Sequence, residues 1–175
     1  MNILKTIQSR RSIRRFTKHA IPLRTAEKIL ESGRWAPSGL NNQPWRFMVL
    51  SAEDKDALAG YTKYSHIIKS ADKVILVFLD KKTSYNYEKD LLAVGACTQN
   101  MLLYIHSIGL GACWLGEILH KRDEINKFFK LSGNLQLEAA LAFGKPATHP
   151  KKGKRKTLKS LLLNKGNGGL WTVDC

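Results

Sequence analysis

The 175-residue sequence has few cysteines, few carboxylates and no long apolar stretch, and each shortage excludes a class of protein. Its three cysteines, Cys97, Cys113 and Cys175, include no CxxC pair, which argues against a disulfide framework and against a thiolate metal site. The five histidines also lack ligand spacing, so we expect no bound metal. The longest apolar run, Val74–Leu79, is far too short to span a membrane. Because there is no apolar core near the N-terminus either, the sequence predicts a cytoplasmic protein without a membrane partner.

The shortage of acidic residues leaves a formal charge of +15, from 29 basic and 14 acidic side chains. Such a balance is typical of proteins that bind a nucleic acid, an anionic membrane or a phosphorylated small molecule. Much of the excess lies in two clusters, at 10–18 and 151–159, near opposite ends of what the length predicts to be a single domain, 1–175. Composition leaves open whether the clusters converge on one anionic group or spread over the surface.

Several common catalytic signatures are also missing. Gly109 and Gly111 begin a string like GxGxxG, but Trp114 stands at the position of the third glycine, so the dinucleotide-binding fingerprint fails. There is no P-loop, no GxSxG elbow and no HExxH, and no Cys or Ser has a motif that places a histidine beside it. These absences argue against a hydrolase with a nucleophilic side chain.

Hydrophobic periodicity predicts an irregular alternation of helices and strands. We expect strands at 46–50, 72–79, 112–116 and 135–143. We expect a helix over 90–108 that is apolar nearly all round and therefore belongs in the core or at a subunit interface. An earlier helix should have Pro22 in its first turn and be ended by Gly33 and Pro37. This alternation favours an α+β fold in which helices cover a central sheet.

Three segments are candidates for binding. Arg10, Arg11 and Arg14 surround Ser12, and the planar fork of arginine matches phosphate, although arginine runs also occur on solvated helix ends. The loop 36–45 holds two prolines and four polar side chains, and it is either an ordinary capped turn or one wall of a polar ligand site. The tail after residue 149 is basic and then apolar at 161–163, so it needs either its own domain or a partner subunit to cover it.

Four landmarks, in order and with matching spacing, resemble the FMN-dependent nitroreductase family in its short, single-domain type: Arg10–Phe16, Ala36–Trp45, Gln99–Leu103 and Gly109–Gly116. The resemblance implies an α+β homodimer with a mostly antiparallel central sheet, an apolar central helix and two FMN sites at the subunit interface. The C-terminal extension, about 149–175, would be exchanged between the subunits. The implied activity moves electrons from NADH or NADPH through flavin N5 to small planar acceptors such as nitroaromatics or quinones, in a ping-pong cycle.

The resemblance also implies which residues bind the cofactor, while no side chain need act as a catalytic acid or base. Residues near the N-terminus would contact the FMN phosphate, ribityl chain and ring edge, and these are Arg10, Arg11, Ser12 and Arg14. The opposite subunit would contribute Pro37, Ser38, Asn41 and Gln43. Beside the flavin ring would pass Leu115, Gly116 and Glu117, and the tail would complete the phosphate site with one or two of Lys154, Arg155 and Lys156.

Two other functions stay open at this point, a flavin-binding protein without turnover and a basic nucleic-acid-binding protein. The second lacks the interleaved aromatic residues typical of its class, since only Phe16 lies among the basic residues. The connection 80–89 is shorter than the insertion that covers the substrate pocket in many members of the family. The sequence therefore predicts the fold and the flavin more sharply than the substrate.

Overall fold

The computed structural model describes residues 2–148, 150 and 153–163. The predicted contacts of residues 164–175, including Trp171, lie outside the described residues. The elements, in chain order, are α1 (Ile3–Ser9), α2 (Leu23–Arg34), η1 (Gly39–Asn41), β1 (Trp45–Val49), α3 (Ala52–Leu58), η2 (Ala59–Tyr61), α4 (Ser65–Ser70), β2 (Lys73–Asp80), α5 (Tyr87–Ser107), β3 (Gly111–Leu115), η3 (Glu117–Lys121), α6 (Arg122–Phe128), β4 (Leu135–Gly144) and η4 (Leu158–Leu161), where η marks a short 3₁₀ helix.

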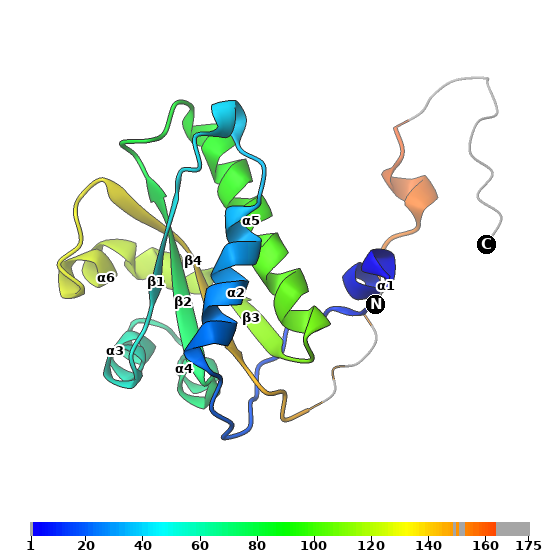
Figure 1. The fold of residues 1–175 in the computed structure, drawn as a ribbon, viewed down its shortest axis with the longest axis horizontal. Helices are drawn as coiled ribbons and strands as arrows, with labels where there is room; N and C mark the ends of the chain where they lie inside the picture. Colours follow the sequence, from blue (N-terminus) through cyan, green and yellow to red (C-terminus); the bar gives the residue numbers. More distant parts are fainter. Residues whose placement is uncertain (1, 149, 151–152, 164–175) are drawn as a thin grey trace.

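One four-stranded sheet forms the centre of the molecule, with the strand order β1-β2-β4-β3 and every neighbouring pair antiparallel (Figure 1). Successive side chains of β2 point to opposite faces. Ile75 and Val77 pack with α2 and α5, whereas Leu76 and Phe78 pack with the residues of α3 and α4. Because both faces are covered, this strand reads as a continuous apolar run. The prediction of an α+β fold with a mostly antiparallel sheet is confirmed.

The predicted start of α2 is one residue too early, because Pro22 precedes the helix rather than forming part of its first turn. The helix ends at Arg34, between Gly33 and Pro37, the two residues expected to end it. Gly33 is buried, and a Cβ atom there would lie 2.9 Å from Cγ of Met101 and 3.0 Å from Sγ of Cys97. This glycine allows α2 to approach α5 closely, which is a packing role that a local sequence pattern does not distinguish from a helix stop.

The long central helix, α5, begins three residues earlier than predicted. Asn86 provides the reason, because its Oδ1 accepts a hydrogen bond from the backbone N–H of Lys89 at 3.0 Å and so caps the helix. One face of α5 packs on the sheet and on α2. Leu92 on another face is 75% exposed, so the apolar character of the helix is only partly used within one chain.

Other apolar side chains are also exposed on α1 and on the described part of the tail. They are Ile3, Leu4, Ile7, Leu158, Leu161, Leu162 and Leu163. Figure 1 shows α1 and η4 standing clear of the sheet and its covering helices. Within the described residues, the tail therefore does not bury its leucines on its own domain. No helix in that same part of the chain is long and apolar enough to cross a membrane.

Candidate functional site

A cavity of about 640 Å³ lies beside the segment that follows α1. Its lining residues are Arg10, Arg11, Ser12, Ile13, Arg14, Arg15, Thr148, Pro150 and Arg155. Five of these are arginines and none is a carboxylate. The structure thus brings an arginine of the C-terminal basic cluster to the arginines of the N-terminal cluster, around one cavity.

Backbone pairing with β3 holds the N-terminal arginine segment in place. Ser12 forms a parallel bridge with Ala112, whose carbonyl accepts a hydrogen bond from the N–H of Ile13 at 2.9 Å. Ile13 and Phe16 are both buried in the core, and the arginines next to them are left at the cavity. Gly111 makes the close approach possible, because a Cβ atom there would lie 2.5 Å from Cγ1 of Ile13.

The electrostatics of the cavity favour an anion. Burial lowers the pKa of Arg10, and the neighbouring guanidinium groups of Arg11 and Arg155 lower it further. Arg11 donates through Nη1 to the carbonyls of Gln8 and Arg10, each at 2.7 Å, but its Nε is buried without a hydrogen-bond partner. Gly153 lies against this guanidinium, because a Cβ atom there would be 2.8 Å from Nε. Crowded cations with an unused donor fit a dianionic phosphate such as that of FMN.

The residues predicted beside the flavin ring lie at the far end of β3. Leu115 is buried as the last residue of the strand, and the exposed Gly116 precedes η3. Glu117 accepts a hydrogen bond through Oε2 from Oγ1 of Thr62 at 2.5 Å. Gly116 comes four residues after Ala112, a distance of roughly 13 Å along an extended strand. The arginine cavity and this turn therefore lie toward the two ends of the same strand.

The loop between α2 and β1 is conformationally strained. Leu40, Asn41 and Gln43 all have positive φ angles, of 53°, 53° and 46°. Such angles are unfavourable for residues other than glycine and persist where the surroundings hold the backbone. Ser38 Oγ accepts a hydrogen bond from the N–H of Gln43 at 3.0 Å, and the Gln43 side-chain amide donates to the Asn41 carbonyl at 3.1 Å. The loop is therefore more constrained than an ordinary capped turn.

A buried carboxylate, which the sequence interpretation missed, anchors this loop. Asp90 is fully buried and accepts hydrogen bonds from Nδ2 of Asn42 at 2.9 Å, from Oγ of Ser84 at 2.6 Å and from the N–H of Tyr85 at 3.0 Å. Burial raises the pKa of Asp90, but these hydrogen bonds together lower it more, so that its pKa lies below its ordinary value. The sequence offered no sharp signal for it, because Glu88 is a second carboxylate in the same first turn of α5.

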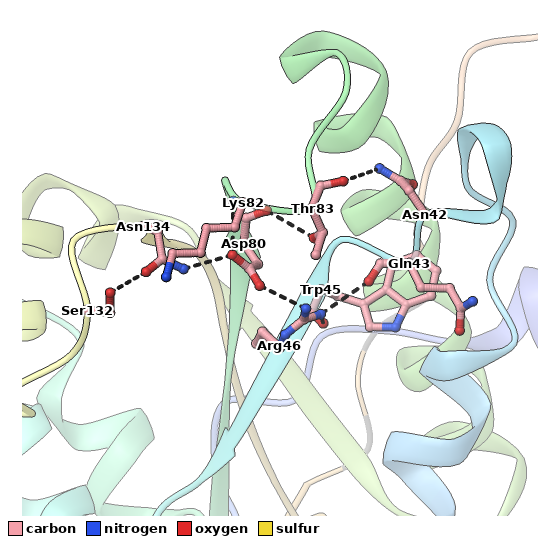
Figure 2. Close-up of polar contacts among 9 residues, drawn as sticks. All are labelled: Asn42, Gln43, Trp45, Arg46, Asp80, Lys82, Thr83, Ser132 and Asn134. Carbon is pink, nitrogen blue, oxygen red and sulfur yellow. Dashed lines mark hydrogen bonds and ion pairs between the residues drawn. The ribbon is translucent and has the colours of Figure 1, made fainter.

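A second anchor joins the end of the loop to β2. Arg46 pairs through Nη2 with Oδ2 of Asp80 at 2.8 Å and donates through Nη1 to the carbonyls of Gln43 and Trp45. Figure 2 shows Arg46 lying between the Gln43 carbonyl and the Asp80 carboxylate, with the amide of Asn134 on the other carboxylate oxygen. The loop is thus held at the start of α5 and at the end of β2.

The loop and the arginine cavity lie at opposite ends of α5. Asn42 bonds Asp90 near the start of this helix, whereas Ser9 Oγ bonds His106 Nε2 near its end at 2.8 Å. Sixteen residues separate the two contacts on α5, a distance of about 24 Å in a helix. Within one chain, the structure therefore does not bring the loop to the cavity. The predicted cofactor-binding residues that lie away from the cavity of their own chain are Pro37, Ser38, Asn41 and Gln43.

Of the three tail residues named above, Arg155 lines the cavity, whereas Lys154 and Lys156 do not. The carbonyl of Lys154 accepts a hydrogen bond from Nη1 of Arg155 at 2.9 Å. In the described parts of the chain there is no group of three or more His, Cys, Asp or Glu side chains suited to a metal ion.

An antiparallel sheet covered by helices, with an arginine-lined cavity beside its edge strand β3, defines an α+β protein with a candidate anion site. The sequence model of the nitroreductase family matches residues 7–64 and 54–145. The chain therefore belongs to the nitroreductase family, and the resemblance identified from the four landmarks is confirmed.

Solved structures and sequences of relatives agree with this family membership. A Desulfovibrio desulfuricans protein, provisionally described as a nitroreductase and solved in complex with FMN, superposes with a TM-score of 0.91 at 46% identity, over 95% of this chain and 98% of that chain. A protein of Methanothermobacter thermautotrophicus, provisionally described as an NADH dehydrogenase or NAD(P)H nitroreductase, is 30% identical over 153 residues, covering 86% of this chain and 80% of its own. An Archaeoglobus fulgidus protein of the same description is 31% identical over 151 residues, covering 82% and 84%.

Proposed function

We propose that this protein is an FMN-dependent oxidoreductase that carries electrons from NADH or NADPH to small planar acceptors such as nitroaromatics or quinones. The observation that carries the proposal is the cavity lined by five arginines and no carboxylate, beside β3 of a nitroreductase fold. The FMN complex of the D. desulfuricans protein supports the cofactor, and the descriptions of the two archaeal relatives support the nicotinamide donor.

The role of the chain in this reaction is to bind and orient the cofactor. Arg10, Arg11, Ser12, Arg14 and Arg155 would hold the phosphate and the ribityl chain. Leu115, Gly116 and Glu117 would form the wall beside the ring, with the side chain of Leu115 buried in the core. FMN would supply the redox chemistry itself by accepting a hydride at N5 and passing the electrons on. No side chain is needed as an acid or base, and donor and acceptor would use the same ring face in turn.

We assign the second wall of the site to a partner subunit. The contacts of the loop with Asp90 and of α1 with His106 lie about 24 Å apart along α5, so the loop and the arginine cavity of one chain are at opposite ends of this helix. The exposed apolar side chains of α1, α5 and the tail form the kind of surface that a second copy would cover. A homodimer with exchanged tails would bury these side chains and bring each loop to the partner's cavity.

Spectroscopy tests the reaction. The purified protein should be yellow, its flavin band should bleach anaerobically on addition of NADH or NADPH, and a nitroaromatic or quinone should restore the band. Steady-state rates should give parallel lines in double-reciprocal plots. A flavin that neither nucleotide bleaches would point to a flavin-binding protein without this turnover, and a colourless protein that takes up no added FMN would contradict the cofactor assignment.

Arg14→Ala tests the phosphate site. A charge-assisted hydrogen bond shielded from solvent contributes about 1.5–3 kcal/mol, and about 1.4 kcal/mol is a factor of ten in affinity. FMN should therefore bind this variant at least about tenfold more weakly, as measured by fluorescence quenching during titration. Arg24→Ala, at an exposed position on α2, is the matched control and should keep its affinity. Equal affinities in the two variants would refute the assignment of Arg14.

Mixed dimers test whether the site crosses the interface. One chain carries Arg14→Ala and the other carries Asn41→Ala with Gln43→Ala, so both homodimers are impaired. If each site combines the arginines of one chain with the loop of the other, a mixed dimer keeps one intact site and regains about half of the wild-type activity. If both walls came from one chain, neither site of the mixed dimer would be intact and no activity would return.

A further inference from the structure

A second cavity, of about 360 Å³, lies between α6 and the start of β4. Four cationic side chains line it, Lys81, Arg122, Lys127 and Lys130, against the single carboxylate of Asp123. It shares no lining residue with the arginine cavity. Figure 1 shows α6 and α1 on opposite sides of the molecule, so the two cavities are separate sites.

The positive charges of this second cavity are largely unneutralised. Among the described residues, no ion pair joins Lys81, Lys127 or Lys130 to a carboxylate. Arg122 has only a distant partner, Glu138, at 4.0 Å from its Nη1. The cavity therefore keeps an excess of positive charge, which an FMN phosphate bound elsewhere would not neutralise. An anionic ligand bound in this cavity would neutralise it.

Lys130, one of these cations, follows the C-terminus of α6 in a backbone conformation that is unfavourable for lysine. The N–H of Leu131 donates to the carbonyl of Asn126 at 2.9 Å, and the N–H of Lys130 donates to the carbonyl of Lys127 at 3.1 Å. This pair of bonds forms a helix-ending motif whose left-handed residue is usually glycine. Here Lys130 takes that conformation, with φ of 51°. Lys130 therefore adds a cation to the cavity at a position whose backbone conformation favours glycine, and its charge also complements the C-terminal end of the α6 dipole.

We infer that this cavity binds a phosphate monoester with a small organic body. The cations on α6 and Lys81 would take the phosphate, while the partly buried side chains of Leu131 and Leu135 provide an apolar wall on the same cavity. The volume lies within the range of about 300–1,000 Å³ typical of small-molecule sites and exceeds what a bare anion needs. The inference stands on these residues alone and does not depend on the proposed redox function.

Isothermal titration of the FMN-loaded protein, freed of excess FMN, tests the site with AMP and with inorganic phosphate. Salt is kept low, at about 50 mM, because screening weakens partly exposed charges. We expect saturable binding of AMP that is at least about threefold tighter than that of inorganic phosphate, since only AMP has a body to contact the apolar wall.

Lys130→Gly separates binding from folding. The variant should bind AMP about fivefold more weakly, in line with the loss of a partly exposed charge contact. Its thermal unfolding midpoint should be equal to or higher than that of the wild type, because glycine takes the left-handed conformation readily. Lys127→Gln should also weaken AMP binding, whereas Lys69→Gln, at an exposed position on α4, is the matched control and should not. Absence of saturable AMP binding, inorganic phosphate binding as tightly as AMP, or equal losses in Lys69→Gln and Lys130→Gly would each overturn the inference.

Discussion

The buried carboxylate of Asp90 offers the sharpest test of how the fold supports the candidate site. Asp90 accepts hydrogen bonds from Asn42 of the loop and from Ser84 and Tyr85 of the turn before α5. Asp90→Asn keeps the shape of the side chain but replaces one acceptor oxygen by an NH₂ group. Hydrogen-bond donors face both carboxylate oxygens of Asp90. In either orientation of the new amide, its NH₂ group therefore faces a donor instead of an acceptor.

The expected loss follows from these contacts. Hydrogen bonds to a charged acceptor contribute about 1.5–3 kcal/mol each, and those to a neutral acceptor about 1 kcal/mol. Weakening the bonds and opposing at least one donor should reduce the free energy of unfolding by about 3 kcal/mol. For a chain of this length, that corresponds to a fall of roughly 6–12 °C in the unfolding midpoint.

Acid pH provides an internal check on the same variant. Burial raises the pKa of Asp90, but its hydrogen bonds lower it more, so the folded pKa lies below the unfolded value of about 4. A carboxyl group of this kind contributes stability that is fully present above the unfolded pKa and is lost as the pH falls through the folded pKa. The difference between wild type and Asp90→Asn should therefore be constant from about pH 5 to 8 and shrink below about pH 4.

Urea denaturation followed by circular dichroism, at several pH values and at fixed protein and FMN concentrations, measures the effect. Ser84→Ala removes one of these bonds to the charged carboxylate and should cost about 1.5–3 kcal/mol. Asp56→Asn, at an exposed position on α3, is the matched control and should stay within about 0.5 kcal/mol of the wild type. A change of less than about 0.5 kcal/mol in Asp90→Asn, or a difference that does not depend on acid pH, would refute the assignment of Asp90 as an anchor.

Two further predictions concern the packing of α2 on α5. Gly33→Ala puts a Cβ atom 2.9 Å from Cγ of Met101 and should lower the free energy of unfolding by about 1–3 kcal/mol in the same urea assay. Gly60→Ala, where a Cβ atom would meet nothing within 4 Å, is its control, and an equal loss in both variants would contradict the packing role of Gly33. Burial raises the pKa of Cys97 to about 12, so iodoacetamide near pH 8 should leave this thiol unmodified in the native protein, as read by peptide mass spectrometry. Modification of native protein as fast as of denatured protein would show that the thiol is accessible.

Local patterns predicted much of the fold. The strands expected at 72–79 and 135–143 correspond to β2 and β4, whose bounds differ from the prediction by one residue at most. Their signal was strong because both central strands are covered on both faces, so the stretches 74–79 and 139–143 within them are continuously apolar. The cap of α3 is a local feature of another kind, since the hydrogen bond from Asp54 N–H to Ser51 Oγ spans only three residues.

Longer-range roles could not be predicted in this way. Gly33 was interpreted as a helix stop, yet its neighbours are Met101 and Cys97 on a helix that begins more than fifty residues later. Asp90 and Asn42 were not selected, because neither is unusual within its own segment. Their importance lies in the hydrogen bond between them, which joins residues 48 positions apart.

The sequence by itself determined the family, the α+β class and the set of arginines suited to a phosphate, because each of these is written in short motifs and in the alternation of apolar residues. Only the tertiary structure decided that Arg155 reaches the cavity beside Arg10, while the loop of Asn41 and Gln43 lies at the other end of α5. It also gathered the lysines around α6 into a second basic cavity. The physical reason is the same in each case, since the distance between segments far apart in the chain is set by packing on the sheet and on α5, and no local pattern contains that distance.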